Sequence, residues 1–358
     1  MKVLQVIPEF KLAGAETMCE NLLSQLKERG IDVVAVSLFR TESAITLRLQ
    51  KRSIPIVYLD KHPGFDLSLF RKLWKLFRKE KPDVVHTHLY AMKYAVPVAL
   101  VTGVKVKIHT VHNIAQKEAT PITQKLNRLL YRAGLVIPVA LSKDVQQTIL
   151  DVYRLKREDV PIILNGSDLK RCIPKDYDDH PETVRFLHIG RFSPQKNHTM
   201  LIAAFEKFHK AFPRTELYLF GEGELMSETK RQVEQAGLEE SVRFRGLTDW
   251  VYPELHDADV FVLPSLYEGI PMTLIEAMGT GLPVIATKVG GVPDMITNGE
   301  EGILTEPDVE QIAEAMTMMM DASLRRRYGE HGRKRALEQF TSETMAERYW
   351  EEYRRLMQ

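Results

Sequence analysis

The sequence predicts an α/β protein built from two doubly wound domains with parallel sheets. Three observations lead to this prediction. The chain has 358 residues, more than one hydrophobic core usually organises. Short β-rich apolar runs alternate with longer helical segments, as in parallel strands joined by helical crossovers. The alternation stops once, over residues 161–182, and then restarts.

The first half is expected to begin with a strand at Val3–Ile7, an apolar run of the kind buried on both faces of a sheet. A helix over Ala15–Arg29 follows, and Gly30 ends it. A later helix has Asp66 as its expected N-cap and Pro82 beyond its end. The other strands expected here are residues 32–39, 83–88, 106–112 and 135–142.

Residues 161–182 are rich in Asp, Pro and Gly, which suits a linker between the halves. The second half is expected to contain a helix over Asn197–Ala211 and another over Met272–Met278, with Pro271 in its first turn. Its expected strands are residues 184–190, 216–221, 241–246, 259–265, 283–287 and 301–305. Residues 309–358 are expected to be almost entirely helical.

Composition limits the classes of partner. The chain has 49 basic and 48 acidic residues, a net charge of +1, which gives no reason to expect a nucleic acid partner. Its two cysteines, Cys19 and Cys172, fit a reducing cytosol and form no disulfide framework. No uninterrupted apolar run reaches the length of about 18 residues that a membrane span needs. Any membrane contact is therefore expected to be peripheral.

Ligands of open parallel sheets bind at the carboxyl ends of the strands, so residues just after strands are the candidates. The loop around Gly14 follows the first strand and opens a helix, whose free N–H groups suit a phosphate or sugar. Taken alone, the loop is slightly more typical of an ordinary turn. It lacks the GxGxxG pattern, which disfavours a dehydrogenase.

The segment GRFSPQKN, Gly190–Asn197, also lies between a strand and a helix. It places Arg191 and Lys196 beside a helix N-terminus, an arrangement that suits a diphosphate. The alternative is two solvated charges in a loop. The position after a strand favours the binding interpretation.

Two glutamates, Glu268 and Glu276, flank seven residues that lead from a strand into a helix. Glutamate is rarely buried without a partner, and a carboxylate accepts hydrogen bonds from sugar hydroxyls. We interpret both as acceptors for ligand hydroxyls. The amides between them, expected to face the loop, belong to Gly269, Ile270, Met272, Thr273 and Leu274. The alternative is that Glu276 pairs with a surface arginine and Glu268 is merely exposed.

Four histidines, His86, His88, His109 and His112, invite a metal interpretation, but no cysteine or carboxylate accompanies them at zinc-like spacing. Packed or hydrogen-bonded side chains are the favoured interpretation, except for His112, which ends a strand on the ligand side. The basic amphipathic segment Leu69–Lys81 is compatible with an anionic membrane surface. A helix that covers the sheet is favoured over it.

Together these motifs resemble the family 4 retaining glycosyltransferases of the type that builds bacterial surface polysaccharides. The resemblance covers nearly the whole chain and is most specific in GRFSPQKN, FGEGEL, residues 258–287 and GGVPDMI, in that order. It implies the GT-B fold, with two Rossmann-like domains facing each other across a cleft. Residues 1–168 would bind the acceptor, residues 169–340 would bind the nucleotide sugar, and the helix of residues 341–358 would cross back onto the first domain.

The resemblance also implies residue roles. The expected donor-binding residues are Gly14, Gly190, Arg191, Lys196, Gly246, Leu247, Glu268, Gly269, Ile270, Met272, Thr273, Leu274 and Glu276. The expected acceptor-binding residues are Ala13, His112 and Asn113. The expected catalytic residues are Arg191, Lys196, Glu268 and His112, with His112 positioning the sugar. Three positions depart from the family pattern: Ala13 replaces a common glycine, Ser167 an apolar residue and Glu222 a common aspartate.

The implied activity is that of a hexosyltransferase. It would move a sugar, with retention, from a nucleotide diphosphate sugar, expected to be UDP-linked, to a lipid-linked or polysaccharide glycan. No DxD-like motif follows the strands, so no metal or other cofactor is expected. The protein is expected in the cytosol, with a peripheral contact at the inner face of the membrane. A nucleotide-sugar epimerase of similar fold and a non-catalytic nucleotide-sugar-binding subunit are the alternatives.

Overall fold

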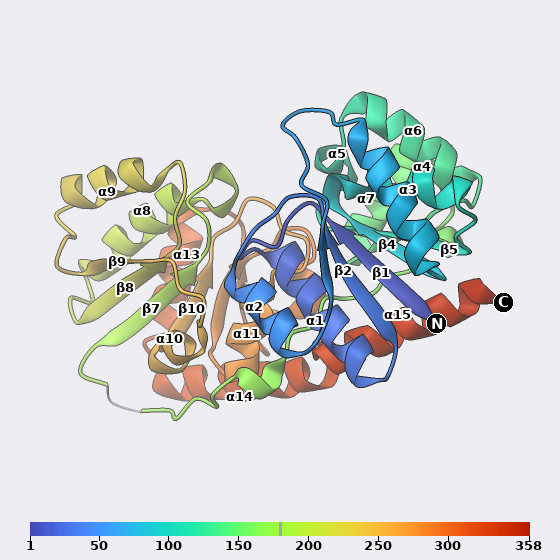
Figure 1. The fold of residues 1–358 in the computed structure, drawn as a ribbon. Helices are drawn as coiled ribbons and strands as arrows, with labels where there is room; N and C mark the ends of the chain where they lie inside the picture. Colours follow the sequence, from blue (N-terminus) through green and yellow to red (C-terminus); the bar gives the residue numbers. More distant parts are fainter. Residues whose placement is uncertain (179–180) are drawn as a thin grey trace. The chain divides into compact units, whose positions relative to one another are not determined.

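The computed structural model describes residues 1–178 and 181–358, which form two compact units (Figure 1). Unit 1 comprises Met1–Ser167 and Ser342–Gln358, and unit 2 comprises Asp168–Thr341. The expected linker contains one short helical turn, Leu169–Arg171. Its residues 179–180 lie outside the described residues.

Unit 1 contains a six-stranded parallel sheet in the order β3-β2-β1-β4-β5-β6. Its strands are β1 (Lys2–Ile7), β2 (Asp32–Ser37), β3 (Ile56–Tyr58), β4 (Val84–His88), β5 (Val106–Val111) and β6 (Ile137–Ala140). Its helices are α1 (Gly14–Glu28), α2 (Ala44–Lys51), α3 (Ser68–Glu80), α4 (Met92–Val101), α5 (Ala115–Glu118), α6 (Pro121–Arg132), α7 (Lys143–Tyr153) and α15 (Ser342–Met357). Strand β3 was not anticipated, because three half-buried edge residues carry too little periodicity.

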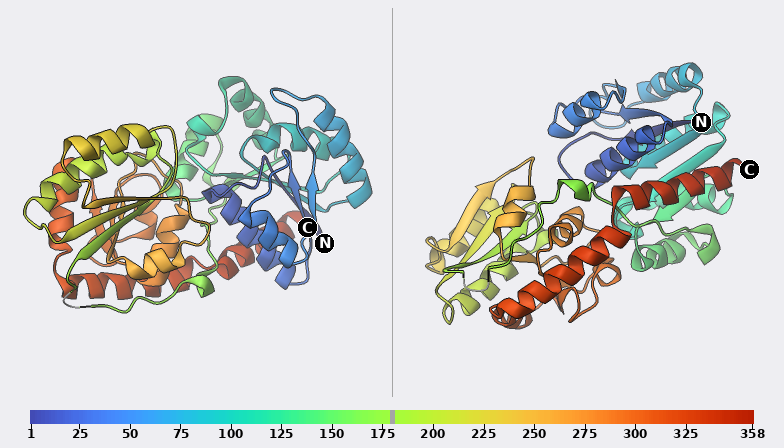
Figure 2. Two further views of the ribbon diagram at one scale, coloured as in Figure 1. Left: turned by 60° about the vertical axis from the view of Figure 1, so that its left-hand side comes forward. Right: turned by 90° about the horizontal axis from the view of Figure 1, so that it is seen from below.

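The two faces of this sheet are covered by different helices. Leu4 and Val6 of β1 pack into a core with α3 and α4, whereas Gln5 points to the opposite face and bonds Tyr353 of α15. Helix α15 lies along this second face, against α1 and β5 (Figure 2). A segment from the far end of the chain thus completes the first unit.

Helix α3 covers the sheet with Leu69, Leu73 and Phe77 buried, so the favoured interpretation of this basic segment is confirmed. The expected N-cap is wrong by one position. The helix begins at Ser68 after Leu67, and Asp66 accepts hydrogen bonds from the Ser68 amide and hydroxyl from outside the helix.

Unit 2 repeats the strand order of unit 1, reading β9-β8-β7-β10-β11-β12. Its strands are β7 (Val184–Ile189), β8 (Thr215–Phe220), β9 (Val242–Gly246), β10 (Val260–Leu263), β11 (Val284–Thr287) and β12 (Gly302–Thr305). Its helices are α8 (His198–His209), α9 (Met226–Gln235), α10 (Tyr252–Asp257), α11 (Met272–Thr280), α12 (Val292–Met295), α13 (Val309–Met318) and α14 (Ala322–Gln339). Pro271 is the N-cap of α11, one position before its expected place. Among the described residues, no helix combines the length and apolar character that crossing a bilayer requires.

Candidate functional site

The centre of the candidate site lies in unit 2, where β7 and β10 are neighbours and the strand order reverses. Ligands of doubly wound sheets bind at such a switch point. The loops that leave these two strands are joined directly. The Leu266 amide donates to the Gln195 carbonyl at 2.8 Å, and Gln195 Nε2 donates to the Tyr267 carbonyl at 2.9 Å.

The two loops are also joined by charge. Lys196 Nζ lies 2.6 Å from Glu268 Oε1, and Ser265 Oγ donates to the same oxygen at 2.6 Å. Glu268 is buried, so it is a buried ion-pair partner and not the freely available hydroxyl acceptor that the sequence suggested. An ammonium carries three hydrogens, so the pairing fixes Lys196 in place and leaves hydrogens for an anionic ligand.

Arg191 differs from Lys196 in its exposure. Its side chain is 74% exposed and pairs with Glu224 at 3.1 Å, whereas the Lys196 side chain is 17% exposed. An exposed ion pair contributes little free energy, so the guanidinium can leave Glu224 for a stronger anion at small cost. The two cations therefore have separate properties, one fixed and one mobile.

Helix α11 begins directly after the Glu268 loop and carries Glu276, which is buried. The amides of Met272 and Thr273 belong to the first turn, whose N–H groups lack partners inside the helix. The expectation for Leu274 is wrong, because its amide donates to the Pro271 carbonyl at 3.2 Å. Gly269 and Ile270 complete the loop, and the Gly269 carbonyl accepts from the Gly291 amide at 3.1 Å.

Two glycines outside the expected set pack directly against the backbone of these loops. Gly290 has φ +52°, and a Cβ there would lie 1.9 Å from the Glu268 carbonyl oxygen. Gly221 has φ +136°, and a Cβ there would lie 2.0 Å from the carbonyl oxygen of Gly190. Only glycine allows these close approaches. Both lie in motifs that carried the resemblance, GGVPDMI and FGEGEL, but no local pattern links them to particular loops.

Gly246 and Leu247, two of the expected donor-binding residues, lie at the carboxyl end of β9. The Gly246 carbonyl accepts from the Gly221 amide at 2.8 Å. This bond connects the end of β9 to the loop after β8, whose Gly221 packs against Gly190. Leu247 follows and is exposed. The expected unit 2 residues thus lie at the carboxyl end of β9, on the loops after β7, β9 and β10, or in α11.

Unit 1 carries the remaining expected residues at the carboxyl ends of its strands. Gly14 is the first residue of α1, and Ala13 is its N-cap, with extended φ −147° and no side-chain cap. His112 follows β5, and its Nε2 lies 3.0 Å from His88 Nδ1. Burial lowers the pKa of His112 to about 4, so its ring is neutral at pH 7. Asn113 Oδ1 accepts from the Ile114 amide at 2.8 Å.

Comparisons with known proteins agree with this arrangement. Residues 12–171 match the model of Glycosyltransferase Family 4, and residues 173–335 match Glycosyl transferases group 1. The N-acetyl-alpha-D-glucosaminyl L-malate synthase of Bacillus anthracis is 27% identical, with 94% of this chain and 93% of that protein covered. The UDP-Gal:alpha-D-GlcNAc-diphosphoundecaprenol alpha-1,3-galactosyltransferase of Escherichia coli is 27% identical over 72% of this chain and 71% of its own length.

Solved structures support the same fold. HepE of Anabaena in complex with UDP-glucose superposes with a TM-score of 0.85 at 21% identity, covering 99% of this chain and 100% of that one. A glycosyltransferase from Rickettsia africae gives 0.85 at 19% identity, covering 100% and 98%. The two sheets, the matched families and these relatives together identify the chain as a glycosyltransferase with the GT-B fold.

Proposed function

We propose that this protein transfers a sugar, with retention of anomeric configuration, from a UDP-linked donor to a hydroxyl of a lipid-linked or polysaccharide glycan. The observation that carries the proposal is the Lys196–Glu268 pair, in the loops that lead into α8 and α11, with Arg191 on the same loop as Lys196. The named substrates of relatives support the donor and acceptor classes. One is named for UDP-Gal and a diphosphoundecaprenol acceptor, and HepE was solved with UDP-glucose.

In the proposed reaction, the bond between the anomeric carbon and the diphosphate oxygen breaks, and the acceptor oxygen bonds to that carbon from the same face. The acceptor proton passes to the departing phosphate. Negative charge grows on the nucleoside diphosphate, where Lys196, Arg191 and the first amides of α11 can stabilise it. Glu276 would accept from the ribose hydroxyls, Glu268 would hold Lys196 and the sugar, and His112 would position the sugar.

Metal independence is part of the proposal, because two cations and a helix N-terminus can neutralise the leaving diphosphate. Among residues 1–178 and 181–358, no three His, Cys, Asp or Glu side chains cluster as metal ligands do. Turnover should persist in excess EDTA. Loss of turnover in EDTA without a change in melting temperature, and its return with Mg²⁺ or Mn²⁺, would reject this part.

A thermal-shift screen over nucleoside diphosphates and their sugars tests the donor, because a ligand that binds only the folded state raises the melting temperature. We expect UDP and UDP-sugars to give the largest shifts. Donor incubated without acceptor should give at most slow hydrolysis, since an isomerised sugar nucleotide would indicate an epimerase instead. NMR of the product anomer then tests retention, and an inverted product contradicts it.

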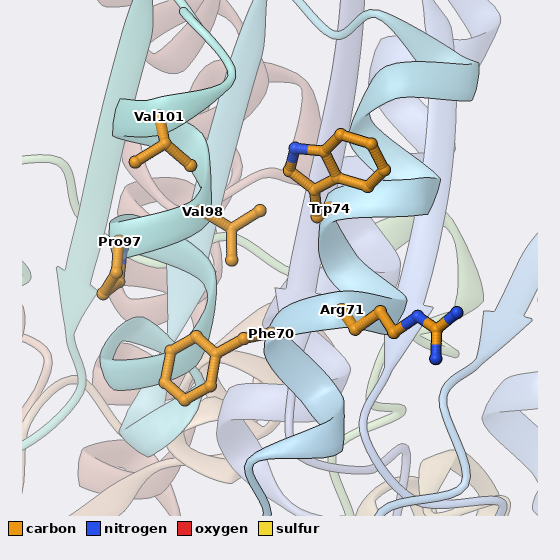
Figure 3. A pocket seen from close by; sticks show the side chains of 6 residues that line it. All are labelled: Phe70, Arg71, Trp74, Pro97, Val98 and Val101. Carbon is orange, nitrogen blue, oxygen red and sulfur yellow. The ribbon is translucent and has the colours of Figure 1, made fainter.

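The membrane contact is proposed for α6 and not for α3. The apolar face of α3 lies on the sheet, and Phe70 and Trp74 line an open surface hollow of about 430 Å³ between α3 and α4 (Figure 3). Helix α6 differs, since Ile122, Leu126 and Leu129 are 83%, 46% and 69% exposed. Their spacing puts them on one face, opposite the buried Asn127 and Tyr131.

Cations accompany this exposed apolar face of α6. Lys125, Arg128 and Arg132 lie along α6, and within the described part of the chain none of them forms an ion pair. Desolvation lowers the pKa of Arg128, and the nearby charges of Arg154 and Arg132 lower it further. The cations in this region therefore repel one another. Apolar side chains flanked by unpaired cations suit an anionic lipid surface.

Flotation with phosphatidylglycerol vesicles tests this contact. Leu129→Ser should weaken vesicle binding about tenfold, from the lost burial of one leucine. Leu47→Ser in α2 is the matched control, because Leu47 is a similarly exposed leucine of unit 1. Equal binding by both variants, or wild-type binding to neutral phosphatidylcholine that is just as strong, would contradict the proposal.

A further inference from the structure

A continuous chain of hydrogen bonds runs through the interior of unit 1, from His112 to the C-terminal helix α15. His112 Nε2 meets His88 Nδ1 at 3.0 Å, and His88 Nε2 meets Gln5 Oε1 at 2.7 Å. Gln5 Nε2 donates to the Tyr353 hydroxyl at 3.1 Å. The chain continues to His86 Nδ1 at 2.7 Å and from His86 Nε2 to Thr110 Oγ1 at 2.7 Å, and it ends at the Tyr349 hydroxyl, 2.7 Å further on.

Every member of this chain except His112 is shielded from water. Gln5, His86, His88, Thr110, Tyr349 and Tyr353 each have a relative exposure of 0%. A buried polar group without a hydrogen-bond partner costs about 1–3 kcal/mol, so each shared hydrogen must point at a lone pair. The direction of one bond therefore constrains the direction of the next.

Gln5 sets that direction, because its oxygen can only accept and its nitrogen can only donate. Its oxygen faces His88, so His88 carries a hydrogen on Nε2. Burial lowers the pKa of His88 well below its usual range, so the ring is neutral and Nδ1 has only a lone pair. That lone pair can accept only from His112, whose own single hydrogen must then sit on Nε2.

The consequence is a defined acceptor at the carboxyl end of β5. His112 Nδ1 retains its lone pair, and no other hydrogen bond to this ring is formed within the part of the chain that the structure describes. Glu118 raises and His109 lowers the pKa of His112, but burial dominates and keeps the ring neutral. A group that meets Nδ1 must donate to it, as a sugar hydroxyl does.

We propose that Gln5 and His88 are positioning residues for sugar transfer, which fix His112 in its Nε2–H tautomer so that Nδ1 accepts a hydrogen bond from a hydroxyl of the transferred sugar. The inference rests on the proposed role of His112. It also gives α15 a function, since the Tyr353 hydroxyl accepts from Gln5 and holds its amide in this orientation.

NMR of the ligand-free protein with ¹⁵N-labelled histidine tests the tautomer without any turnover assay. The eleven histidines of the chain can be resolved by removing one signal with His112→Asn. We expect a neutral wild-type His112 ring with its hydrogen on Nε2. A hydrogen on Nδ1 would mean that the Gln5 amide has the opposite orientation, and it would overturn the proposal.

Gln5→Met then removes the group that sets the direction while keeping a similar side-chain length. We expect a mixed His112 tautomer signal and about a tenfold lower kcat, equivalent to about 1.4 kcal/mol in the barrier. Tyr349→Phe is the matched control, since it removes one buried hydroxyl at the far end and should leave both the signal and kcat unchanged. Equal effects of the two variants would show a structural role only and overturn the proposal.

The two readouts separate the possible failures. An unchanged His112 signal in Gln5→Met rejects the orienting role whatever the turnover. A changed signal with unchanged kcat and KM rejects the role of His112 in sugar transfer, and with it this proposal, but leaves the donor site of unit 2 in place. Should Gln5→Met fail to fold, Gln5→Glu replaces it, because the two carboxyl oxygens can exchange donor and acceptor roles and so set no fixed direction. A His112 signal identical to that of Tyr349→Phe would again reject the orienting role.

Discussion

In unit 2 the loops after β7 and β10 are joined to each other by an ion pair and three further hydrogen bonds, and Gly221 and Gly290 pack directly against them. In unit 1 the loop after β1 has the same place in the same strand order, yet Leu12, Ala13 and Gly14 are exposed and α1 lacks a side-chain cap. The polar groups of unit 1 instead form a chain inside the sheet.

This difference separates two ways to build a site on one topology. Unit 2 fixes Lys196 and Glu268 before any ligand arrives, and charge held in advance is what stabilising a leaving diphosphate requires. Unit 1 fixes one ring, His112, and leaves the loop after β1 exposed. The contrast agrees with the proposed division between a donor that is always a nucleotide sugar and a larger, more variable acceptor.

The largest expected effect comes from breaking the unit 2 ion pair. Lys196→Met should lower turnover about a hundred- to a thousandfold. It should also destabilise the fold by about 3–5 kcal/mol, because Glu268 becomes a buried, unpaired charge. Adding Glu268→Gln should restore the melting temperature but not the activity.

Arg191→Ala should lower turnover severely with an unchanged melting temperature, since the ion pair of Arg191 with Glu224 is exposed. Full activity in either single variant would remove the diphosphate assignment.

The close packing of Gly290 against the loop after β10 can be tested next with Gly290→Ala. The added Cβ would overlap the Glu268 carbonyl, so the loop must move, and we expect weaker UDP binding in a titration. Gly299→Ala is the control, because Gly299 has φ +83° but open space around its Cβ position. It should cost about 1 kcal/mol of stability and leave UDP affinity unchanged. Similar UDP affinities in the two variants would show that the contact does not support the site.

Unit 1 has a buried carboxylic acid, Glu16, in the first turn of α1. Its burial makes the free energy of unfolding depend on pH. Burial raises the pKa of Glu16 from 4.5 to about 7. The folded protein therefore keeps this proton at pH values where the unfolded chain has lost it, and the contribution to stability falls as pH rises from about 4.5 to 7. Glu16→Gln should flatten this decline in denaturant titrations. An unchanged pH slope would mean that Glu16 is ionised in the folded protein.

The smallest effect is expected at the uncapped start of α1. Ala13 has the extended conformation of an N-cap, so Ala13→Ser should stabilise the protein by about 0.5–1 kcal/mol. Ala13→Gly should change stability by only a few tenths, because φ −147° needs no glycine. The free energy of unfolding in urea measures both. A large loss of activity in either variant would show that the loop is held more tightly than its exposure indicates.

The sheets of this protein, and which residues follow their strands, could be predicted from the sequence alone. The alternation of strands and helices predicted both sheets, missing only the three-residue strand β3, and it correctly placed Arg191, Lys196, Glu268, Gly14 and His112 after strands, whereas their roles stay predictions. These predictions succeed because burial in a parallel sheet leaves a period in the sequence, and because parallel strands bring their carboxyl ends to one edge.

Only the tertiary structure decided which of these residues meet. Lys196 and Glu268 are 72 residues apart in the chain, and Gln5 and Tyr353 are 348 apart, so no local pattern links them. The outward apolar face of α6 was equally hidden, since periodicity reports that a helix has an apolar face but not which face its neighbours cover. Which two side chains meet depends on packing between segments that are distant in the chain, whereas the periodicity of the sequence records only which residues of one segment are buried.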